Sequence, residues 1–341
     1  MGGGVSIGQA RHPNDAETFA KQSDKLDEGL VNYSSKNSIR LRKEHKMRAG
    51  VIGLGDMGSG LAKNLIKNGF ETTGLDLSQE RLVAFEAMGG KPARTNAEVG
   101  ANADVVYVMV MNGNQAKKVI LGKEGLISHM TEGGVVILTA TVKPREAREI
   151  AEAMVGSGIH LVDSPVSGGF AGAQNGTLTM MAACEDSVMA KCRSVMEAVS
   201  STIHHVGTQA PQGQVVKACL QSLIGSIFSA TFEASVLAAK AGVKGDDLYK
   251  VFSTSGAGCG CTNTALGHII DREFANTGSG IGTMHKDLSI SMDFAEDLGV
   301  PMHMASTAMQ IFHAGKSKYP NGDNWACVKI MEEIVGAALH R

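Results

Sequence analysis

The apolar and polar residues of this chain follow two different periodic patterns, one before and one after about residue 210. From Arg48 onward, short apolar runs predict strands, and the segments between them carry apolar residues at helical spacing. Strands and helices in regular succession indicate parallel strands joined by right-handed crossovers. We expect strands at residues 50–54, 72–75, 105–109, 135–138, 160–162, 177–183 and 202–206. We expect helices at residues 57–68, 79–88, 115–121, 144–155 and 187–199.

The rhythm changes after Ala210, where the predicted strands stop. Residues 212–241 contain no proline and predict a single helix, roughly 45 Å long at 1.5 Å per residue. Because apolar residues occupy most of its faces, we expect this helix to be buried, either as the centre of a second domain or against a second subunit. Further helices are expected at residues 246–253, 262–270, 286–298, 304–315 and 324–339. The pattern therefore predicts an α/β domain with a parallel sheet, followed by an all-α domain built on one long helix.

One stretch near the start of this pattern has the features of a dinucleotide-binding turn. The apolar run Val51-Ile52 leads into three glycines spaced G-x-G-x-x-G, an amphipathic segment follows, and a second apolar run ends at Asp76. The glycines allow a tight turn, close approach of a pyrophosphate, and close packing of helix on strand. The acid can accept both ribose hydroxyls and would repel a 2′-phosphate, which favours NAD over NADP. The predicted cofactor-binding residues here are Gly53, Leu54, Gly55, Asp56, Met57, Gly58 and Asp76.

The glycine turn makes the first part a Rossmann-type NAD-binding domain, which we place at residues 47–208. The all-α substrate and dimerisation domain is then expected at residues 209–341. Residues 1–46 are polar and charged, and they predict a disordered tail. This tail opens with Met1-Gly2 and has Ser6, which fits the N-myristoylation pattern, and Met47 could be the start of a shorter product.

Composition and charge exclude several classes of protein. The chain has 341 residues, 43% of them hydrophobic, and a net charge of -2. No basic stripe is interleaved with aromatic residues, so no nucleic-acid partner is expected, and no run of about 18 apolar residues predicts a membrane span. The six cysteines are scattered, and the close pair Cys259 and Cys261 lacks a second pair, so no metal site is expected. Free thiols are typical of a reducing compartment, and we expect a cytoplasmic location.

The stretch from Asp163 to Gly169 reads D-S-P-V-S-G-G and directly follows a predicted strand. In open parallel sheets, ligands bind beyond the carboxyl ends of the strands. Gly168 and Gly169 leave backbone N–H groups open to an anion, and Ser167 adds a hydroxyl donor. The stretch predicts a cradle for a carboxylate, with a plain turn-rich loop as the alternative.

Four-residue spacing places Gly213, Lys217, Gln221 and Gly225 on one face of the long helix. The glycines would make room beside the lysine, and a partly desolvated lysine has a lowered pKa that suits general acid/base work near neutral pH. Alternatively, the lysine reaches out to solvent and the glycines serve helix packing. Lys286 follows a glycine-rich stretch and is either a second cation aimed at the same site or a residue at a helix start.

Taken in order, these motifs resemble those of the β-hydroxyacid dehydrogenase family, which includes 3-hydroxyisobutyrate dehydrogenase and tartronate semialdehyde reductase. The resemblance covers about residues 48–330. It implies that Lys217 is the catalytic lysine and that Lys286 lies near both nicotinamide and substrate. It also implies that Thr141 contacts the cofactor and that the cradle at residues 163–169 binds substrate.

One residue departs from the usual family pattern. The family commonly has Asn four residues after the catalytic lysine, where this chain has Gln221. The branch that resembles L-threonate dehydrogenases, which act on four-carbon sugar acids, also tends to have Gln there. Residues 305–308 and 319–323 look like that branch too. Because Gln reaches one methylene further than Asn, we expect a pocket shaped differently from that of relatives with three-carbon substrates.

The resemblance thus implies an NAD-dependent enzyme that oxidises a small hydroxy acid, such as L-threonate, with Lys217 taking the hydroxyl proton. We expect a homodimer or a homotetramer. Oxidation of 3-hydroxyisobutyrate or reduction of tartronate semialdehyde are alternatives within the class, and a non-catalytic NAD-binding scaffold is the alternative outside it. The expected substrate-binding residues are Ser167, Gly168, Gly169, Gln221 and Lys286.

Overall fold

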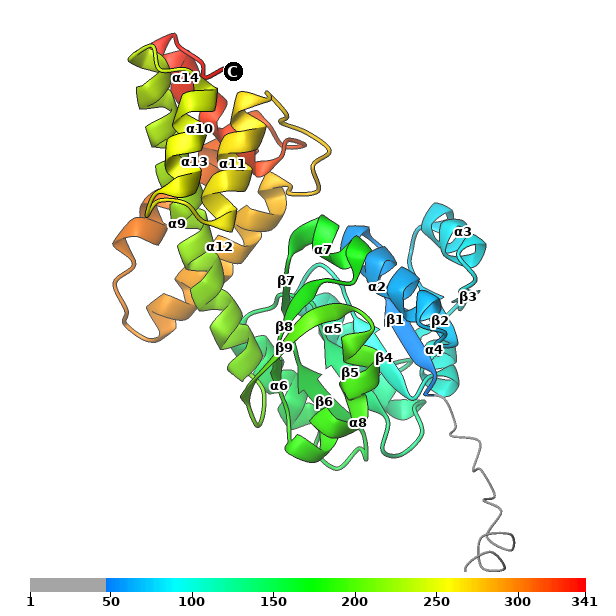
Figure 1. The fold of residues 1–341 in the computed structure, drawn as a ribbon. Coiled ribbons are helices and arrows are strands. Elements are labelled where there is room, and N and C mark those ends of the chain that lie inside the picture. The colour runs from blue at the N-terminus through cyan, green and yellow to red at the C-terminus, as the bar shows by residue number, and fades with distance from the viewer. Residues whose placement is uncertain (1–46) are drawn as a thin grey trace, which may run out of the picture. The chain divides into compact units, whose positions relative to one another are not determined.

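The computed structural model describes residues 47–341, and the predicted tail with its myristoylation pattern lies outside the described residues. Nine strands form one sheet in the order β3-β2-β1-β4-β5-β6-β8-β7, with β9 paired to β8 (Figure 1). The strands are β1 (Ala49–Ile52), β2 (Thr72–Leu75), β3 (Lys91–Pro92), β4 (Val105–Val108), β5 (Val135–Leu138), β6 (His160–Asp163), β7 (Val166–Ser167), β8 (Leu178–Ala183) and β9 (Ser200–Gly207). The Rossmann-type fold expected from the sequence is confirmed.

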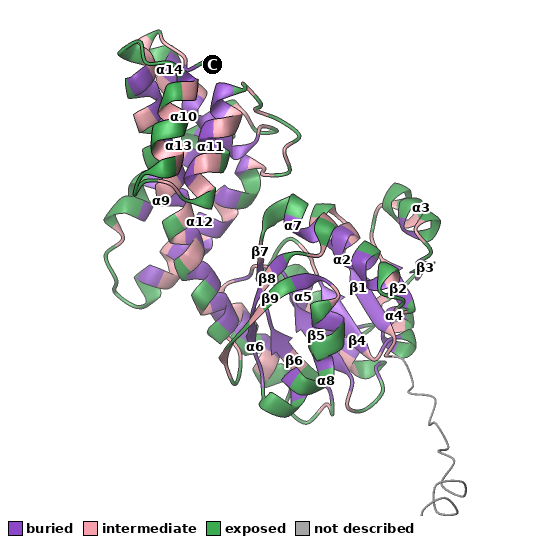
Figure 2. Cartoon of the chain, viewed as in Figure 1, coloured by how far each residue is buried: buried purple, intermediate pink, exposed green. Residues whose placement is uncertain are grey.

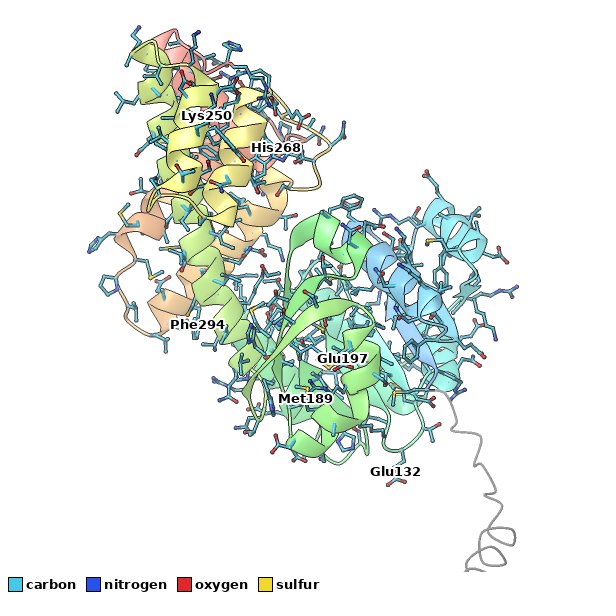
Figure 3. All side chains as sticks on the ribbon, viewed as in Figure 1. Glu132, Met189, Glu197, Lys250, His268 and Phe294 are labelled. Atoms are coloured by element: carbon cyan, nitrogen blue, oxygen red, sulfur yellow. The ribbon has the colours of Figure 1, made fainter. Side chains whose placement is uncertain are left out.

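Helices cover both faces of this sheet, which explains why its central strands are continuous apolar runs. Tyr107 of β4 lies in one buried cluster, and its neighbour Val108 lies in the other, because successive side chains of a strand point to opposite faces. Met189 and Glu197, labelled in Figure 3, mark the helix α8 on the first face. The helices are α2 (Asp56–Lys67), α3 (Gln79–Ala87), α4 (Asn96–Asn102), α5 (Gly113–Leu121), η1 (Leu126–Ser128), α6 (Pro144–Met154), α7 (Gly169–Asn175) and α8 (Asp186–Glu197).

One edge of the sheet departs from the parallel arrangement. β1 to β6 pair in parallel, but β8 runs antiparallel to both β6 and β7 and parallel to β9. The reason is the connection: between β6 and β8 the chain makes only the two-residue strand β7 and the short helix α7, instead of a full crossover. The sequence pattern missed β3, β7, α4 and α7, all of which are short.

The chain after β9 is helical and packs around the 29-residue helix α9 (Gln212–Lys240). Its core holds Phe232, Phe312 and Trp325. The ring of His268, which Figure 3 labels, stacks on Trp325 at 5.1 Å between ring centroids. The predicted helix at 286–298 begins five residues earlier, and the one predicted at 324–339 divides into η2 and α14. The elements are α10 (Gly245–Thr254), α11 (Gly260–Ile270), α12 (Ile281–Asp297), α13 (His303–Lys318), η2 (Asn324–Cys327) and α14 (Val328–Val335).

The other helices of this chain bury the long helix α9 on only part of its circumference. Figure 2 shows buried and exposed residues along its whole length, and Leu223 and Leu237 are 58% and 73% exposed. Its place at the centre of the helical domain is confirmed, and burial of its remaining face against a second subunit stays a prediction. By length and composition, α9 is also the one described helix that could cross a membrane, although half of the relevant window is buried inside the protein. Its place as the core helix accounts for that composition.

Candidate active site

The glycine turn has the geometry that a dinucleotide-binding turn requires. Gly53 adopts a φ of +91°, which favours glycine, and a Cβ on Gly58 would lie 1.7 Å from the Gly53 carbonyl oxygen. On Gly55 the nearest atoms that a Cβ would meet belong to the Arg81 guanidinium, at 3.7 Å, so this side of the turn is open. Gly55 precedes α2, whose N-terminus has no side-chain cap and leaves its N–H groups available. The residues present therefore fit a bound pyrophosphate.

Asp76 fixes the turn from the end of β2. Its Oδ2 accepts a hydrogen bond from the Leu54 amide at 2.7 Å, and its Oδ1 accepts one from the Ser78 amide at 2.9 Å. The half-exposed Arg81 lies 3.5 Å from the same Oδ1. An acid at this place fits the hydroxyls of an unphosphorylated ribose, and the arginine beside it was not singled out in the sequence.

The predicted carboxylate cradle lies at the start of α7. Gly168 and Gly169 adopt φ values of +125° and +59°, which non-glycine residues rarely adopt, and Ser167 is half-buried in β7. The following helix packs on α2, where Gln174 donates to the carbonyl of Asp56 at 3.3 Å. The structure therefore joins the cradle to the first turn of the cofactor helix.

The same motif also anchors the long helix. Asp163 is fully buried at the end of β6 and accepts hydrogen bonds from Gln214, from the backbone N–H at 3.1 Å and from Nε2 at 3.0 Å. Gln214 Nε2 also donates to the Ala140 carbonyl, and its Oε1 accepts from the Val142 amide at 3.1 Å. Burial raises the pKa of Asp163 to about 6, and the bonds from Gln214 and Gly213 partly oppose this. One glutamine thus ties α9 to the ends of two strands.

Lys217 lies one turn after this anchor and is 6% exposed, so it does not reach out to solvent. Within residues 47–341 its ammonium makes no hydrogen bond. The glycines on its helix face allow other parts of the chain to pack closely against α9. A Cβ on Gly213 would meet the Asp163 carbonyl oxygen at 2.5 Å, and one on Gly225 would meet Leu288 at 2.7 Å. The expectation that they open space beside the lysine is therefore wrong, because strand ends and α12 fill that space.

Two predicted residues, Gln221 and Lys286, are brought together close to Lys217 by Asp287, which the sequence analysis did not single out. Asp287 is buried, and its Oδ2 accepts a 2.6 Å hydrogen bond from Gln221 Nε2. Lys286 Nζ lies 3.0 Å from Asp287 Oδ1 and donates to the Thr141 carbonyl at 3.0 Å. Lys286 sits in the second turn of α12 and is not at its start. The only sequence signal for Asp287 was its position after Lys286.

Burial sets the protonation of this cluster. Desolvation lowers the pKa of Lys217 to about 8; nearby Asp287 opposes this decrease, and Lys286 adds to it. A lysine with a pKa near 8 can both take and give a proton close to neutral pH. The cluster therefore has the charge balance of an acid/base site.

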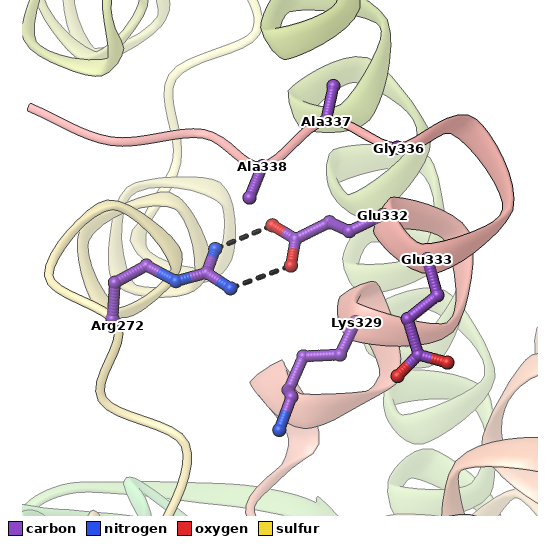
Figure 4. A pocket seen from close by; sticks show the side chains of 7 residues that line it. All are labelled: Arg272, Lys329, Glu332, Glu333, Gly336, Ala337 and Ala338. Carbon is purple, nitrogen blue, oxygen red and sulfur yellow. Dashed lines mark hydrogen bonds and ion pairs between the residues drawn. The ribbon is translucent and has the colours of Figure 1, made fainter.

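A separate hollow of about 400 Å³ lies at the C-terminal end of the chain, where Arg272 forms a bidentate pair with Glu332 at 2.5 and 2.7 Å (Figure 4). Lys329 and Glu333 line the same hollow. Because the arginine and the buried carboxylate form hydrogen bonds with each other, we interpret this ion pair as a structural contact that joins the end of α11 to α14.

Comparison with known proteins agrees with this geometry. A family model described as the NAD binding domain of 6-phosphogluconate dehydrogenase matches residues 48–207, and one described as NAD-binding of NADP-dependent 3-hydroxyisobutyrate dehydrogenase matches residues 211–331. An L-threonate dehydrogenase of Escherichia coli O6:H1 is 32% identical over 291 residues, which cover 85% of this chain and 96% of that protein. The chain belongs to the β-hydroxyacid dehydrogenase family.

Two further members of the family show how widely the likeness extends. The 2-(hydroxymethyl)glutarate dehydrogenase of Eubacterium barkeri is 30% identical, covering 87% of this chain and 98% of that protein. The crystal structure of 3-hydroxyisobutyrate dehydrogenase from Salmonella typhimurium matches with a TM-score of 0.76 at 29% identity, covering 83% and 99% of the two chains. This β-hydroxyacid dehydrogenase is thus an NAD-dependent oxidoreductase, which confirms the predicted family, enzyme class and cofactor.

Proposed function

We propose that this β-hydroxyacid dehydrogenase oxidises a four-carbon sugar acid, such as L-threonate, with Lys217 as the general base. The cofactor would bind to residues 47–208, and the all-α domain at residues 209–341 would supply the lysine. The observation that carries the proposal is the buried Lys217 with a pKa of about 8, close to Asp287 and Lys286. An ammonium kept from solvent without a structural partner costs stability, which is typical of functional sites.

The proton path runs through Lys217. Its neutral amine accepts the proton of the substrate hydroxyl while the carbon that carries this hydroxyl loses hydride. NAD, when bound, supplies the hydride acceptor at C4 of its nicotinamide. The positive charge of Lys286 lies close to Lys217 and therefore favours the neutral form of Lys217. The same lysine also donates a hydrogen bond to the Thr141 carbonyl.

Gln221 supports a polyhydroxy acid as substrate. Its Nε2 donates a 2.6 Å hydrogen bond to Asp287 Oδ2, so its Oε1 remains to accept a hydrogen bond from a substrate. A substrate hydroxyl is a donor, whereas a carboxylate accepts only. The buried amide therefore suits a second hydroxyl on the substrate, while Ser167, Gly168 and Gly169 would hold the carboxylate.

Relatives of this chain support the same substrate class. The L-threonate dehydrogenases of Escherichia coli and Cupriavidus necator are both 32% identical to it. The main alternative is 3-hydroxyisobutyrate, because a probable mitochondrial 3-hydroxyisobutyrate dehydrogenase of Dictyostelium discoideum is also 32% identical. Reduction of tartronate semialdehyde is a further alternative, and it would use Lys217 as an acid.

Formation of NADH by the purified full chain across a panel of hydroxy acids tests the proposal. The panel contains L-threonate, D-erythronate, D-glycerate, L-serine, 3-hydroxyisobutyrate and 3-hydroxypropionate. A kcat/KM for L-threonate at least about tenfold above the others is expected, since a hydrogen bond to a buried polar group discriminates strongly. A preference for 3-hydroxyisobutyrate would contradict the role of Gln221. NAD binding without turnover in either direction would favour a scaffold protein.

We also propose a cytoplasmic location for this enzyme. Cys184, Cys192 and Cys327 are buried free thiols, and no disulfide forms among residues 47–341. Free buried thiols are typical of a reducing compartment. Microscopy of the full chain with a C-terminal tag tests this, and an organellar or membrane pattern would contradict it.

A further inference from the structure

Two cysteines lie at the start of α11, where the chain turns in from α10, and the proposed reaction uses neither of them (Figure 1). Cys259 caps the N-terminus of the helix, and Cys261 lies in its first turn, with Gly260 between them. Cys259 is exposed to solvent and Cys261 is half-buried. The pair therefore combines a thiol that reagents can reach with a second thiol close behind it.

The backbone directs the sulfur of Cys259 onto the first turn of α11. Its φ of -147° and ψ of 169° are extended, as is typical of a cap residue. The Thr262 amide donates to Cys259 Sγ at 3.5 Å, and Thr262 Oγ1 lies 3.4 Å from the same sulfur. These bonds from Thr262, together with weaker ones from Cys261, lower the pKa of the Cys259 thiol. The exposed thiol is thus held partly as a thiolate, which is its nucleophilic form.

Cys261 has the opposite tendency. Burial is the main cause that raises the pKa of its thiol, and the charge of Cys259 and a hydrogen bond between the two side chains add to the increase. The bond means that the two sulfurs are neighbours, with the Cys261 thiol donating to the Cys259 thiolate. A thiolate next to a protonated thiol is the arrangement of a reactive cysteine and its resolving partner.

We propose that Cys259 is a site of reversible oxidation by hydrogen peroxide and that Cys261 resolves it into a disulfide. The Cys259 thiolate attacks one peroxide oxygen, the O–O bond breaks, and the other oxygen leaves as hydroxide, which takes a proton to become water. Cys259 is then a sulfenic acid. The sulfur of Cys261 attacks this sulfur, the S–O bond breaks, and water leaves with the Cys261 proton. Two thiols and one peroxide thus give one disulfide and two waters.

The surroundings of the pair allow the disulfide to close and to open again. A Cβ on Gly260 would meet no heavy atom within 4 Å, so the turn borders open space, and glycine gives its backbone freedom to move. With one residue between the cysteines, the disulfide would close a small, strained ring, and strained exposed disulfides are readily reduced. Such a transient bond is typical of redox sensing in a reducing compartment.

Peptide mapping of the oxidised full chain tests the proposal. Trypsin cleaves after Lys250 and Arg272 and so releases residues 251–272, which contain both cysteines of the pair and no other. After treatment with peroxide, this peptide should lose about 2 Da, the mass of two hydrogens, and dithiothreitol should restore it. Residues 218–240 provide the matched control, because they contain the exposed Cys219 in the middle of α9. Cys219 should be oxidised at least about tenfold more slowly.

Two variants separate the roles of the cysteines. Cys261→Ser should form no disulfide, and dimedone should trap the sulfenic acid of Cys259. Cys259→Ser should leave Cys261 reduced, because its thiol is half-buried and keeps its proton. Cys219→Ser should form the disulfide at the wild-type rate. Thermal melting verifies that the variants are folded, and the comparison of the two wild-type peptides needs no variant.

Three results would overturn the proposal. The first is oxidation of Cys219 as fast as that of Cys259. The second is a wild-type chain whose Cys259 proceeds to a sulfinic acid without a disulfide, since Cys261 would then not resolve it. The third is a disulfide that joins residues 251–272 to a different peptide.

Discussion

Gln214 binds the carboxylate of Asp163 twice, once through its backbone N–H and once through its side chain. The two residues are 51 positions apart and fully enclosed. Because the same glutamine also bonds to the loop after β5, it fixes the first turn of α9 relative to two strand ends. Lys217 lies three residues further on, so its position depends on this contact.

Replacing Gln214 should therefore damage both stability and rate. Gln214→Ala leaves the Val142 amide and the Ala140 carbonyl buried without this partner, and it removes the side-chain bond to Asp163 while keeping the backbone one, which should lower the free energy of unfolding by about 2–4 kcal/mol. Urea denaturation measures this loss. We also expect a lower kcat with little change in the Kd for NAD. Gln212→Ala, at an exposed position in the same helical turn, should change stability by less than about 0.5 kcal/mol.

Lys217→Met should inactivate the enzyme and stabilise it. We expect kcat to fall by at least about 100-fold, the usual scale for a general base. The lowered pKa means that burying the charged lysine costs stability, so at pH 7 the variant should gain up to about 3 kcal/mol. Between pH 8 and 10.5 the unfolded chain binds more protons at this group, so wild-type stability rises and the gap closes.

Chemical denaturation at pH 7 and pH 10, together with turnover, measures both effects. Lys240→Met is the control, because Lys240 is exposed on the same helix. Near-normal turnover of Lys217→Met would remove the proposed role, and a large loss of stability at pH 7 would mean that the ammonium has a structural partner.

The pH profile of oxidation should move in opposite directions in two variants. The wild-type kcat/KM should rise with pH through about 8, as Lys217 loses its proton. Asp287→Asn removes a charge that raises the pKa of Lys217, so the midpoint should shift to lower pH. Lys286→Met removes a charge that lowers it, so the midpoint should shift to higher pH. The control Lys250→Met, at an exposed position, should leave the midpoint unchanged. If Asp287→Asn and Lys286→Met also left the midpoint unchanged, a group other than Lys217 would be the one that titrates.

Asp76 and Arg81 should together set the choice of cofactor. Asp76→Ala removes the repulsion of a 2′-phosphate and leaves the guanidinium of Arg81 free to bind it. The ratio of kcat/KM with NAD to that with NADP should fall by at least about tenfold. Adding Arg81→Ala should restore much of the ratio, and Arg81→Ala alone should keep the preference for NAD. An unchanged ratio in Asp76→Ala would mean that other groups recognise the ribose.

Much of this architecture could be predicted because it is local in sequence. The glycine turn, its strand, its helix and Asp76 lie within one short stretch, and each glycine has a conformational reason that is visible in the spacing. The apolar runs of β4 and β5 follow from burial on both faces. These features depend on neighbours a few residues away, so periodicity is enough to find them.

The other features depend on contacts between distant residues. Asp287 meets Gln221 across 66 positions, and Lys286 meets Thr141 across 145. From the sequence, Gly213 and Gly225 were expected to leave space beside Lys217, but Asp163 and Leu288 fill that space. The face of α9 that the domain leaves open could not be predicted for the same reason, since an apolar helix does not reveal which of its faces the domain covers. The roles of Lys217 and the cradle, and the domain boundary after residue 208, stay predictions.

The peptide group that joins Thr141 to Val142 is held from two different helices: Lys286 of α12 donates to its carbonyl, and Gln214 of α9 accepts from its N–H. A third tie joins Lys143 to Asp293. This loop, which we expect to contact the cofactor through Thr141, is thus ordered by the protein itself. It has little conformational entropy left to lose, so almost none of the free energy of NAD binding goes into ordering this loop.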